Sequence, residues 1–131
     1  MPGSILQRGL RQQKRDSIRL TVPRDLQVIV QVQTADGGTW PARCLDLSLY
    51  GILLEFPQTK TPSISPDDKV LITIQFAKDL AKVHGITLHC KARRVGFSLP
   101  DGPGDRKLRD DQSLSSIFRN LERIILRKRQ R

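Results

Sequence analysis

Apolar and polar residues alternate along most of this chain with the period of β-strands. In the stretch LQVIVQVQT, residues 26–34, the side chains of Val28, Val30 and Val32 fall on one side. Four further segments have the same apolar, β-branched character: TWPARCLDLS, GILLEF, KVLITIQF and GITLHCKARRV. Turn sequences separate the segments, and ADGG at residues 35–38 is the strongest because Asp-Gly adopts a positive φ at little cost. The pattern predicts consecutive antiparallel strands joined by short loops.

Toward the end of the sequence the period changes to that of a helix. Apolar residues recur there at positions i, i+3, i+4, i+7 and i+11: Leu114, Ile117, Phe118, Leu121 and Ile125. This spacing predicts one amphipathic α-helix over residues 112–131. Five or six short strands followed by a single helix predict an all-β fold, either a small antiparallel barrel or a sandwich. A barrel is favoured because it leaves no strand edge exposed, and the helix can then cover one open end or face.

A chain of 131 residues is expected to form one domain. Residues 1–17 show little periodicity and are expected to be a flexible basic arm, residues 18–111 the barrel, and residues 112–131 the helix with its basic end. No apolar run has the length of a signal-peptide core or a membrane span, which favours a cytoplasmic protein without a transmembrane segment. Cys44 and Cys90 both lie in apolar runs and are expected to be reduced, buried packing residues.

The positive charge of the chain lies at its two ends. The formal net charge is +10. Residues 1–24 carry six Lys and Arg and one acidic residue, residues 123–131 carry five Lys and Arg and no acidic residue, and the intervening residues are balanced. A basic arm of this kind is either a solvated tail or part of a site for an anion.

The sequence lacks the residue patterns of several classes of enzyme and metal site. It has no glycine-rich phosphate loop of the P-loop or Rossmann type. His84 and His89 have no metal-ligand spacing with the two cysteines, so we expect no metal, and we place His89 on a strand surface. Ser48 has no histidine partner at a nucleophile elbow, so nothing favours an enzyme. Trp40 and Tyr50 are expected to be packing residues.

Two short motifs carry the functional prediction. Arg15 and Arg19 form R-x-x-x-R directly before the apolar Leu20, and Asp46, Ser48 and Gly51 form D-x-S-x-x-G between two predicted strands. The order of these motifs and the strands around them resemble the PilZ domain, a bacterial receptor for cyclic di-GMP. The resemblance covers most of the chain and implies a six-stranded antiparallel β-barrel with a C-terminal helix. In that family the last barrel strand carries a Gly-apolar-Phe pattern, but the corresponding region here, RKLRDDQ at residues 106–112, is polar. The sixth strand is therefore expected to be short, displaced or supplied by another segment.

The resemblance also implies a role for each motif residue. Arginine offers a planar fork of donors that clamps a phosphate or binds the O6/N7 edge of guanine. Asp46 would accept hydrogen bonds from the guanine N–H edge, and Ser48 would donate its hydroxyl to a phosphate or base. Gly51 would either adopt a positive φ or let the ligand approach the backbone.

Three basic residues are weaker candidates for the same site. Arg11 also stands four residues before Arg15, but the family pattern places the second arginine at the start of the first strand, which favours Arg15 and Arg19. In the family that this chain resembles, the residue before the first arginine, here Lys14, influences ligand stoichiometry, and the resemblance implies that a cation there favours an intercalated ligand dimer over a single ligand. Arg93 or its neighbour Arg94 could stack on a guanine, and strand alternation lets at most one of them do so.

The predicted function is therefore a non-enzymatic cyclic di-GMP receptor in bacterial signal transduction. Motility or biofilm regulation is the kind of output that the resemblance implies, and the sequence does not specify which. The arm would fold over the ligand, and an effector protein would recognise the rearranged surface. A homodimer is left open, and no DNA partner is expected. One alternative is a basic nucleic-acid-binding barrel, although aromatic residues make up only 5% of the chain. The other is a PilZ-like protein–protein adaptor, whose basic helix end, Arg123 to Arg131, would dock an acidic partner or an anionic membrane surface.

Overall fold

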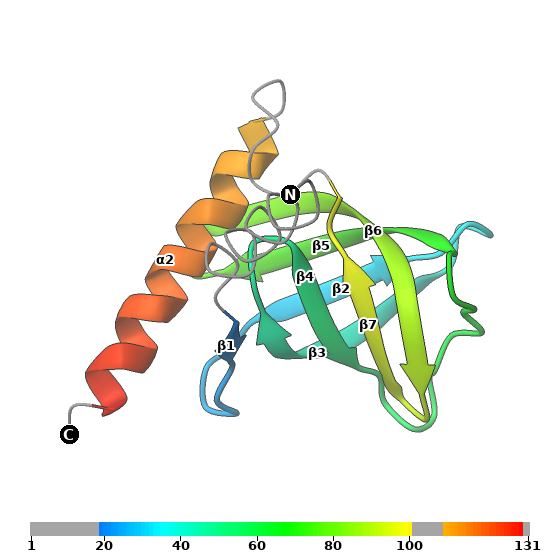
Figure 1. Cartoon of the computed structure of the whole chain (residues 1–131), viewed down its shortest axis with the longest axis horizontal. Helices are drawn as coiled ribbons and strands as arrows, with labels where there is room; N and C mark the ends of the chain where they lie inside the picture. Colours follow the sequence, from blue (N-terminus) through cyan, green and yellow to red (C-terminus); the bar gives the residue numbers. More distant parts are fainter. Residues whose placement is uncertain (1–18, 101–108, 130–131) are drawn as a thin grey trace, which may run out of the picture.

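The computed structural model, shown in Figure 1, describes residues 19–100 and 109–129. Within these ranges the chain forms one antiparallel sheet and one helix. The elements, in chain order, are β1 (Leu20–Thr21), β2 (Ile29–Gln33), β3 (Thr39–Leu47), β4 (Gly51–Glu55), β5 (Lys69–Phe76), β6 (Asp79–Lys91), β7 (Arg94–Ser98) and α2 (Arg109–Arg129). The predicted arm, with Arg11, Lys14 and Arg15, lies outside the described residues.

The sheet closes into a barrel. Hydrogen-bonded neighbours follow the order β3–β2–β5–β6–β7–β4, and β4 pairs in turn with β3, so six strands form a complete ring. All of these pairs are antiparallel. The short strand β1 adds to the ring beside β3, with Leu20 opposite Leu47 and Thr21 opposite Asp46. The predicted fold class, a six-stranded antiparallel barrel with one C-terminal helix, is confirmed.

The sixth strand of the ring is displaced from the region where the family pattern places it, which is one of the alternatives that the sequence left open. It is β7, not residues 106–112, and the helix begins at Arg109, ahead of the predicted start at residue 112. The predicted segment 85–95 is in fact two strands with a tight turn at Ala92 and Arg93. Ala92 has a φ of 55°, as does Ala77 in the equally tight β5–β6 turn. Neither turn carries the Gly, Asn or Asp that normally signals a positive φ, so the sequence pattern did not reveal them.

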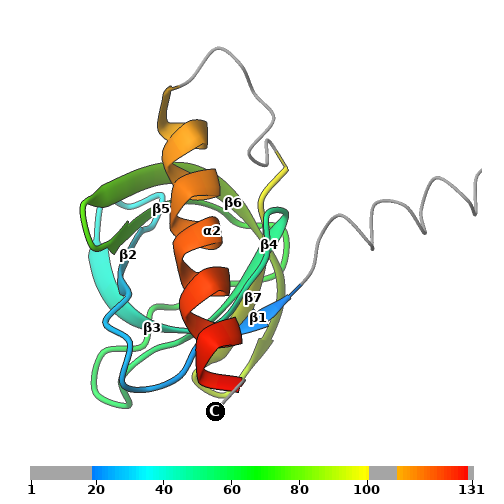
Figure 2. The ribbon, with the colours of Figure 1, turned by 90° about the vertical axis from the view of Figure 1, so that its left-hand side faces the viewer.

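The helix α2 covers one end of the barrel (Figure 2). All five residues of the predicted apolar stripe are buried, as expected: Leu114, Ile117, Phe118, Leu121 and Ile125. They complete a single core that also contains the inward side chains Val30 and Val32 of β2. Polar contacts fix the helix at its edges, since Asn120 Nδ2 donates to Asp79 Oδ2 at 3.4 Å and Lys128 pairs with Asp25 in the loop before β2. Among the described residues, no helix has the length and apolar character needed to cross a membrane.

The two cysteines differ in a way that labelling can measure. Both are free, but Cys44 is buried and Cys90 is exposed, so the prediction that both pack in the core was wrong for Cys90. Burial raises the pKa of the Cys44 thiol to about 12. Because the thiolate is the nucleophile, iodoacetamide at pH 8 is expected to alkylate Cys90 in the native protein and Cys44 only after denaturation. Mass spectrometry of the two cysteine peptides provides the measurement. Equal native labelling of both peptides would contradict the buried position of Cys44.

Candidate functional site

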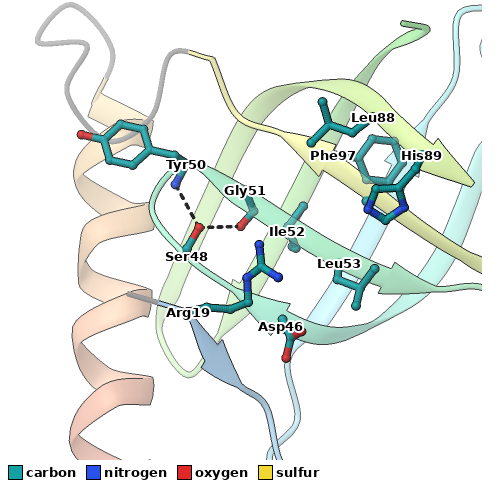
Figure 3. A pocket seen from close by; sticks show the side chains of 11 residues that line it. Arg19, Asp46, Ser48, Tyr50, Gly51, Ile52, Leu53, Leu88, His89 and Phe97 are labelled. Carbon is teal, nitrogen blue, oxygen red and sulfur yellow. Dashed lines mark hydrogen bonds between the residues drawn. The ribbon is translucent and has the colours of Figure 1, made fainter. Parts of the chain in front are cut away.

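A cavity of about 320 Å³ lies on the outer wall of the barrel, beside the start of β1 (Figure 3). Its walls come from four parts of the chain that are distant in sequence: the residue before β1, the end of β3 with the β3–β4 turn, the start of β4, and the paired strands β6 and β7. The lining residues are Arg19, Asp46, Ser48, Tyr50, Gly51, Ile52, Leu53, Leu88, His89, Gly96 and Phe97.

Strand register aligns four of these residues in one row across the barrel wall. Asp46 of β3 lies opposite Leu53 of β4, Leu53 lies opposite Gly96 of β7, and Gly96 lies opposite His89 of β6. Side chains on neighbouring positions of a strand point to opposite faces. The adjacent residues Ile52 and Phe97 are accordingly buried in the core, which leaves the row on the outer face.

A break in regular pairing precedes the residue at each end of this row. On β3 the register shifts between Cys44 and Asp46, so that Asp46 rather than Leu45 faces Leu53. On β6 it shifts between Thr87 and His89, so that His89 rather than Leu88 faces Gly96. Such β-bulges re-aim a side chain relative to the regular alternation. The two bulges therefore place a carboxylate and an imidazole at opposite ends of the row.

The β3–β4 turn is held together by Ser48. Its backbone N–H donates to the Gly51 carbonyl at 2.9 Å, and its hydroxyl donates to the same carbonyl at 3.2 Å. The hydroxyl oxygen also accepts the Tyr50 N–H at 3.3 Å (Figure 3). With a residue exposure of only 6%, Ser48 is committed to the turn. In this geometry its hydroxyl proton serves the backbone, and its contribution to the site is to fix the path of the chain from Asp46 to Gly51.

Gly51 is not required by backbone conformation. Its φ is not positive, so the first of the two predicted reasons for glycine, a left-handed backbone conformation, does not apply. A Cβ at this position would lie 3.4 Å from the Phe97 carbonyl oxygen and 3.7 Å from Ser48 Oγ, both ordinary contacts. The folded chain therefore has room for alanine at position 51. The remaining predicted reason for glycine is that it lets a ligand approach the backbone.

The structure brings together all four of the motif residues that it describes. Arg19 is exposed, directly precedes β1, and lines the cavity with Asp46, Ser48 and Gly51. The β1–β3 pairing accounts for this proximity, because Thr21 lies opposite Asp46. The other predicted arm residues, Arg11, Lys14 and Arg15, lie outside the described ranges.

Arg93 lies far from this cavity. It occupies the β6–β7 turn and lines a separate cavity with Pro41 and Glu55, at the opposite end of β4 and β7 from Gly51 and Ser98. Its neighbour Arg94 donates from Nε to Glu55 Oε2 at 3.1 Å, and this hydrogen bond lowers the pKa of Glu55. Neither arginine contributes to the cavity around Asp46.

Several lining residues were not predicted from the sequence. Tyr50 is 46% exposed, and in Figure 3 its ring points away from Asp46 and His89, so its predicted packing role was wrong, whereas Trp40 packs against the core as expected. His89 was correctly placed on a strand surface, but its proximity to the motif depends on long-range register. Tyr50 stands inside the D-x-S-x-x-G motif, and this position was the available signal. The described residues contain no group of three or more His, Cys, Asp or Glu side chains arranged to hold a metal ion.

Comparison with known proteins identifies both a family and similar folds. The family model for the PilZ domain matches residues 10–112 of the chain. The PilZ domain of YcgR from Escherichia coli, solved with c-di-GMP, has a TM-score of 0.70 and 19% sequence identity, over 91% of this chain and 99% of that chain. At this identity the structural likeness shows a shared fold. No curated protein sequence matches the chain.

Two longer solved structures show the same fold. YcgR from E. coli in complex with c-di-GMP has a TM-score of 0.65 and 19% identity, over 89% of this chain and 50% of that chain. The K. pneumonia MrkH–c-di-GMP complex has a TM-score of 0.65 and 15% identity, over 88% of this chain and 54% of that chain. The present chain thus spans about half the length of these two proteins.

Proposed function

Because this chain belongs to the PilZ domain family, we propose that it is a non-catalytic receptor for cyclic di-GMP that binds the dinucleotide in the cavity beside β1. The observation that carries the proposal is the meeting of two separate motifs. Arg19 from the first motif and Asp46, Ser48 and Gly51 from the second all line one cavity on the barrel wall. The similar structures of the YcgR PilZ domain and of MrkH are complexes with the same ligand.

The charges around the cavity match the chemistry of the ligand. The Arg19 guanidinium provides a planar set of N–H donors for a phosphate or for the O6/N7 edge of guanine. The Asp46 carboxylate accepts hydrogen bonds and suits the N–H edge of guanine, which phosphate-binding cations cannot recognise. A cation and a carboxylate in one cavity therefore favour a ligand with both phosphate and guanine over a simple anion.

We further propose that Arg15 joins Arg19 at the ligand, with Arg11 and Lys14 as additional cations. Since Arg19 directly precedes β1, the arm is attached at the rim of the cavity, and ligand binding would order it there. An effector protein would then recognise the ordered arm, as proposed for a ligand-controlled switch. Binding of one ligand or of an intercalated dimer is distinguished by the stoichiometry of titration.

Isothermal titration calorimetry with cyclic di-GMP tests this function. We expect a dissociation constant in the micromolar range or tighter, because two or three bidentate contacts of roughly 1–3 kcal/mol each exceed the ordering costs. Cyclic di-AMP is the matched control, since it has the same phosphate backbone but presents an amino group where guanine presents O6. Failure to bind cyclic di-GMP would remove this proposal. If cyclic di-AMP and single-stranded oligonucleotides bind as tightly as cyclic di-GMP, the protein is instead a general polyanion-binding protein.

Gly51→Ala tests whether the ligand approaches the backbone of the β3–β4 turn. We expect the free energy of unfolding to change by less than about 1 kcal/mol, because the added methyl group meets only ordinary contacts and the φ is not positive. Cyclic di-GMP affinity is expected to fall by about tenfold, since the methyl group projects into the cavity. Calorimetry and chemical denaturation measure the two quantities separately. Unchanged affinity would place the ligand away from this turn.

A further inference from the structure

His89 lies at the far end of the residue row from Asp46, and no motif of the sequence includes it. We propose that His89, seated on Gly96, is an aromatic platform on which a guanine base of the bound dinucleotide stacks. This inference rests on the proposed function and adds a second subsite to it. Figure 3 shows His89 on the opposite side of Leu53 from Asp46, within the same cavity.

The close packing of His89 on Gly96 is the first observation. A Cβ at position 96 would lie 2.6 Å from His89 Nε2, 2.7 Å from Cε1 and 3.3 Å from Cδ2. The two shortest of these distances fall below the range of real non-bonded contacts, so any larger residue at this position would displace the ring. Because three consecutive ring atoms cover the glycine, the imidazole lies over β7 and forms part of the cavity wall.

The β-bulge on β6 is the second observation. Regular alternation after the buried Thr87 would turn Leu88 outward and His89 toward the core. The bulge instead leaves both Leu88 and His89 exposed, and both line the cavity. A bulge interrupts the ladder of hydrogen bonds. Here it places the imidazole ring of His89 opposite Gly96 on the adjacent strand β7.

The distance across the wall matches the size of a dinucleotide. Asp46, Leu53, Gly96 and His89 occupy four adjacent strands, and three interstrand steps of about 4.8 Å place the two ends about 14 Å apart. One purine cannot contact both ends, whereas a ligand with two purines can pair one with Asp46 and stack the other on His89. An aromatic plane binds a base through its π-face and needs no particular hydrogen-bond pattern.

Three substitutions at His89 separate stacking from hydrogen bonding. His89→Ala is expected to weaken cyclic di-GMP binding by about tenfold, the change that base–aromatic stacking of ordinary strength produces. His89→Phe keeps a ring without a polar atom and should bind within about twofold of wild type. His89→Gln keeps a side-chain donor without a ring and should bind as weakly as His89→Ala. Lys82→Ala, at an exposed position of β6 outside the cavity, is the control and should bind like wild type.

Gly96→Ala tests the seat of the ring independently. We expect the methyl group to displace His89 and to weaken binding by about tenfold, with no further loss when it is combined with His89→Ala. Additive losses in this double-variant cycle would overturn the coupling between the two residues. Should Gly96→Ala not fold, the His89 series decides alone, because position 89 is exposed.

The outcomes distinguish this inference from the function on which it rests. If wild type binds cyclic di-GMP and Arg19→Ala does not, but His89→Ala binds within twofold of wild type, the stacking platform fails and the receptor function stands. If His89→Gln restores binding and His89→Phe does not, the imidazole acts as a hydrogen-bond donor and the platform is likewise overturned. If wild type does not bind, both proposals fail together.

Discussion

Arg19→Ala is expected to weaken cyclic di-GMP binding by on the order of 100-fold. Arg19 lines the cavity and is exposed, and the described residues offer it no hydrogen bond or ion pair. Because the side chain is exposed, its removal should leave the fold unchanged. A charge-assisted bidentate contact contributes roughly 1–3 kcal/mol, and the upper end of this range corresponds to about a 100-fold change in affinity. Calorimetry at constant salt measures the loss.

Arg24→Ala is the matched control for Arg19→Ala. It removes the same charge from an exposed arginine just beyond β1, but Arg24 lines a different cavity, with Arg43 and Ile29. We expect its affinity for cyclic di-GMP to stay within about twofold of wild type. If both substitutions weaken binding equally, the interaction depends on net charge alone, as in a nucleic-acid-binding arm whose affinity falls steeply with salt. Arg19→Lys should bind with intermediate affinity, since it keeps the charge but loses the fork of donors.

Local patterns in the sequence were sufficient to predict most of the barrel. Strand β2 has the period of two that a half-buried strand requires, and Val30 and Val32 are buried as that pattern predicts. The hairpin turn at residues 35–38 was equally clear, and Gly37 there has a φ of 89°. The stripe of α2 was predictable for the same reason, because one face of the helix packs on one core.

The strand β7 could not be found by the same reasoning. Its only boundary signal is the turn at Ala92, where an alanine adopts a conformation that sequence rules assign to glycine or asparagine. The strand itself reads RVGFS, with Val95, Gly96 and Phe97 all buried, so it shows no alternation. A segment packed on both faces loses the period of two, and without a turn signal it merged with the preceding strand.

The residues of the candidate site also fall into a group that local sequence patterns predict and a group that they do not. Arg19, Asp46, Ser48 and Gly51 belong to two compact motifs, and the resemblance to a family identified them directly. His89 and Gly96 are brought to the cavity by pairing between β6, β7 and β4, with a bulge that shifts the register. A shift of one residue exchanges the two faces of a strand. Because no local pattern specifies such a shift, this half of the cavity required coordinates.

Leu121→Ala is expected to be the most destabilising of the substitutions considered. Leu121 is fully buried where α2 covers the end of the barrel, within the same core as Ile117 and Phe118. Leucine-to-alanine changes at such positions cost about 2–5 kcal/mol, because a cavity remains where the side chain was. We expect a loss of about 3 kcal/mol in the free energy of unfolding, measured by urea denaturation with an unchanged m-value.

Leu126→Ala removes the same atoms from the same helix and is the control. Leu126 is 49% exposed on the outer face of α2, so its substitution should cost less than about 0.5 kcal/mol. Equal losses at the two positions would show that α2 does not close the barrel.

Since the cavity contains no residue of α2, cyclic di-GMP at 100 times its dissociation constant should stabilise wild type and Leu121→Ala alike, by about 2.7 kcal/mol. A smaller gain in the variant would mean that the helix and the ligand site are energetically coupled through β6, the strand that contacts both.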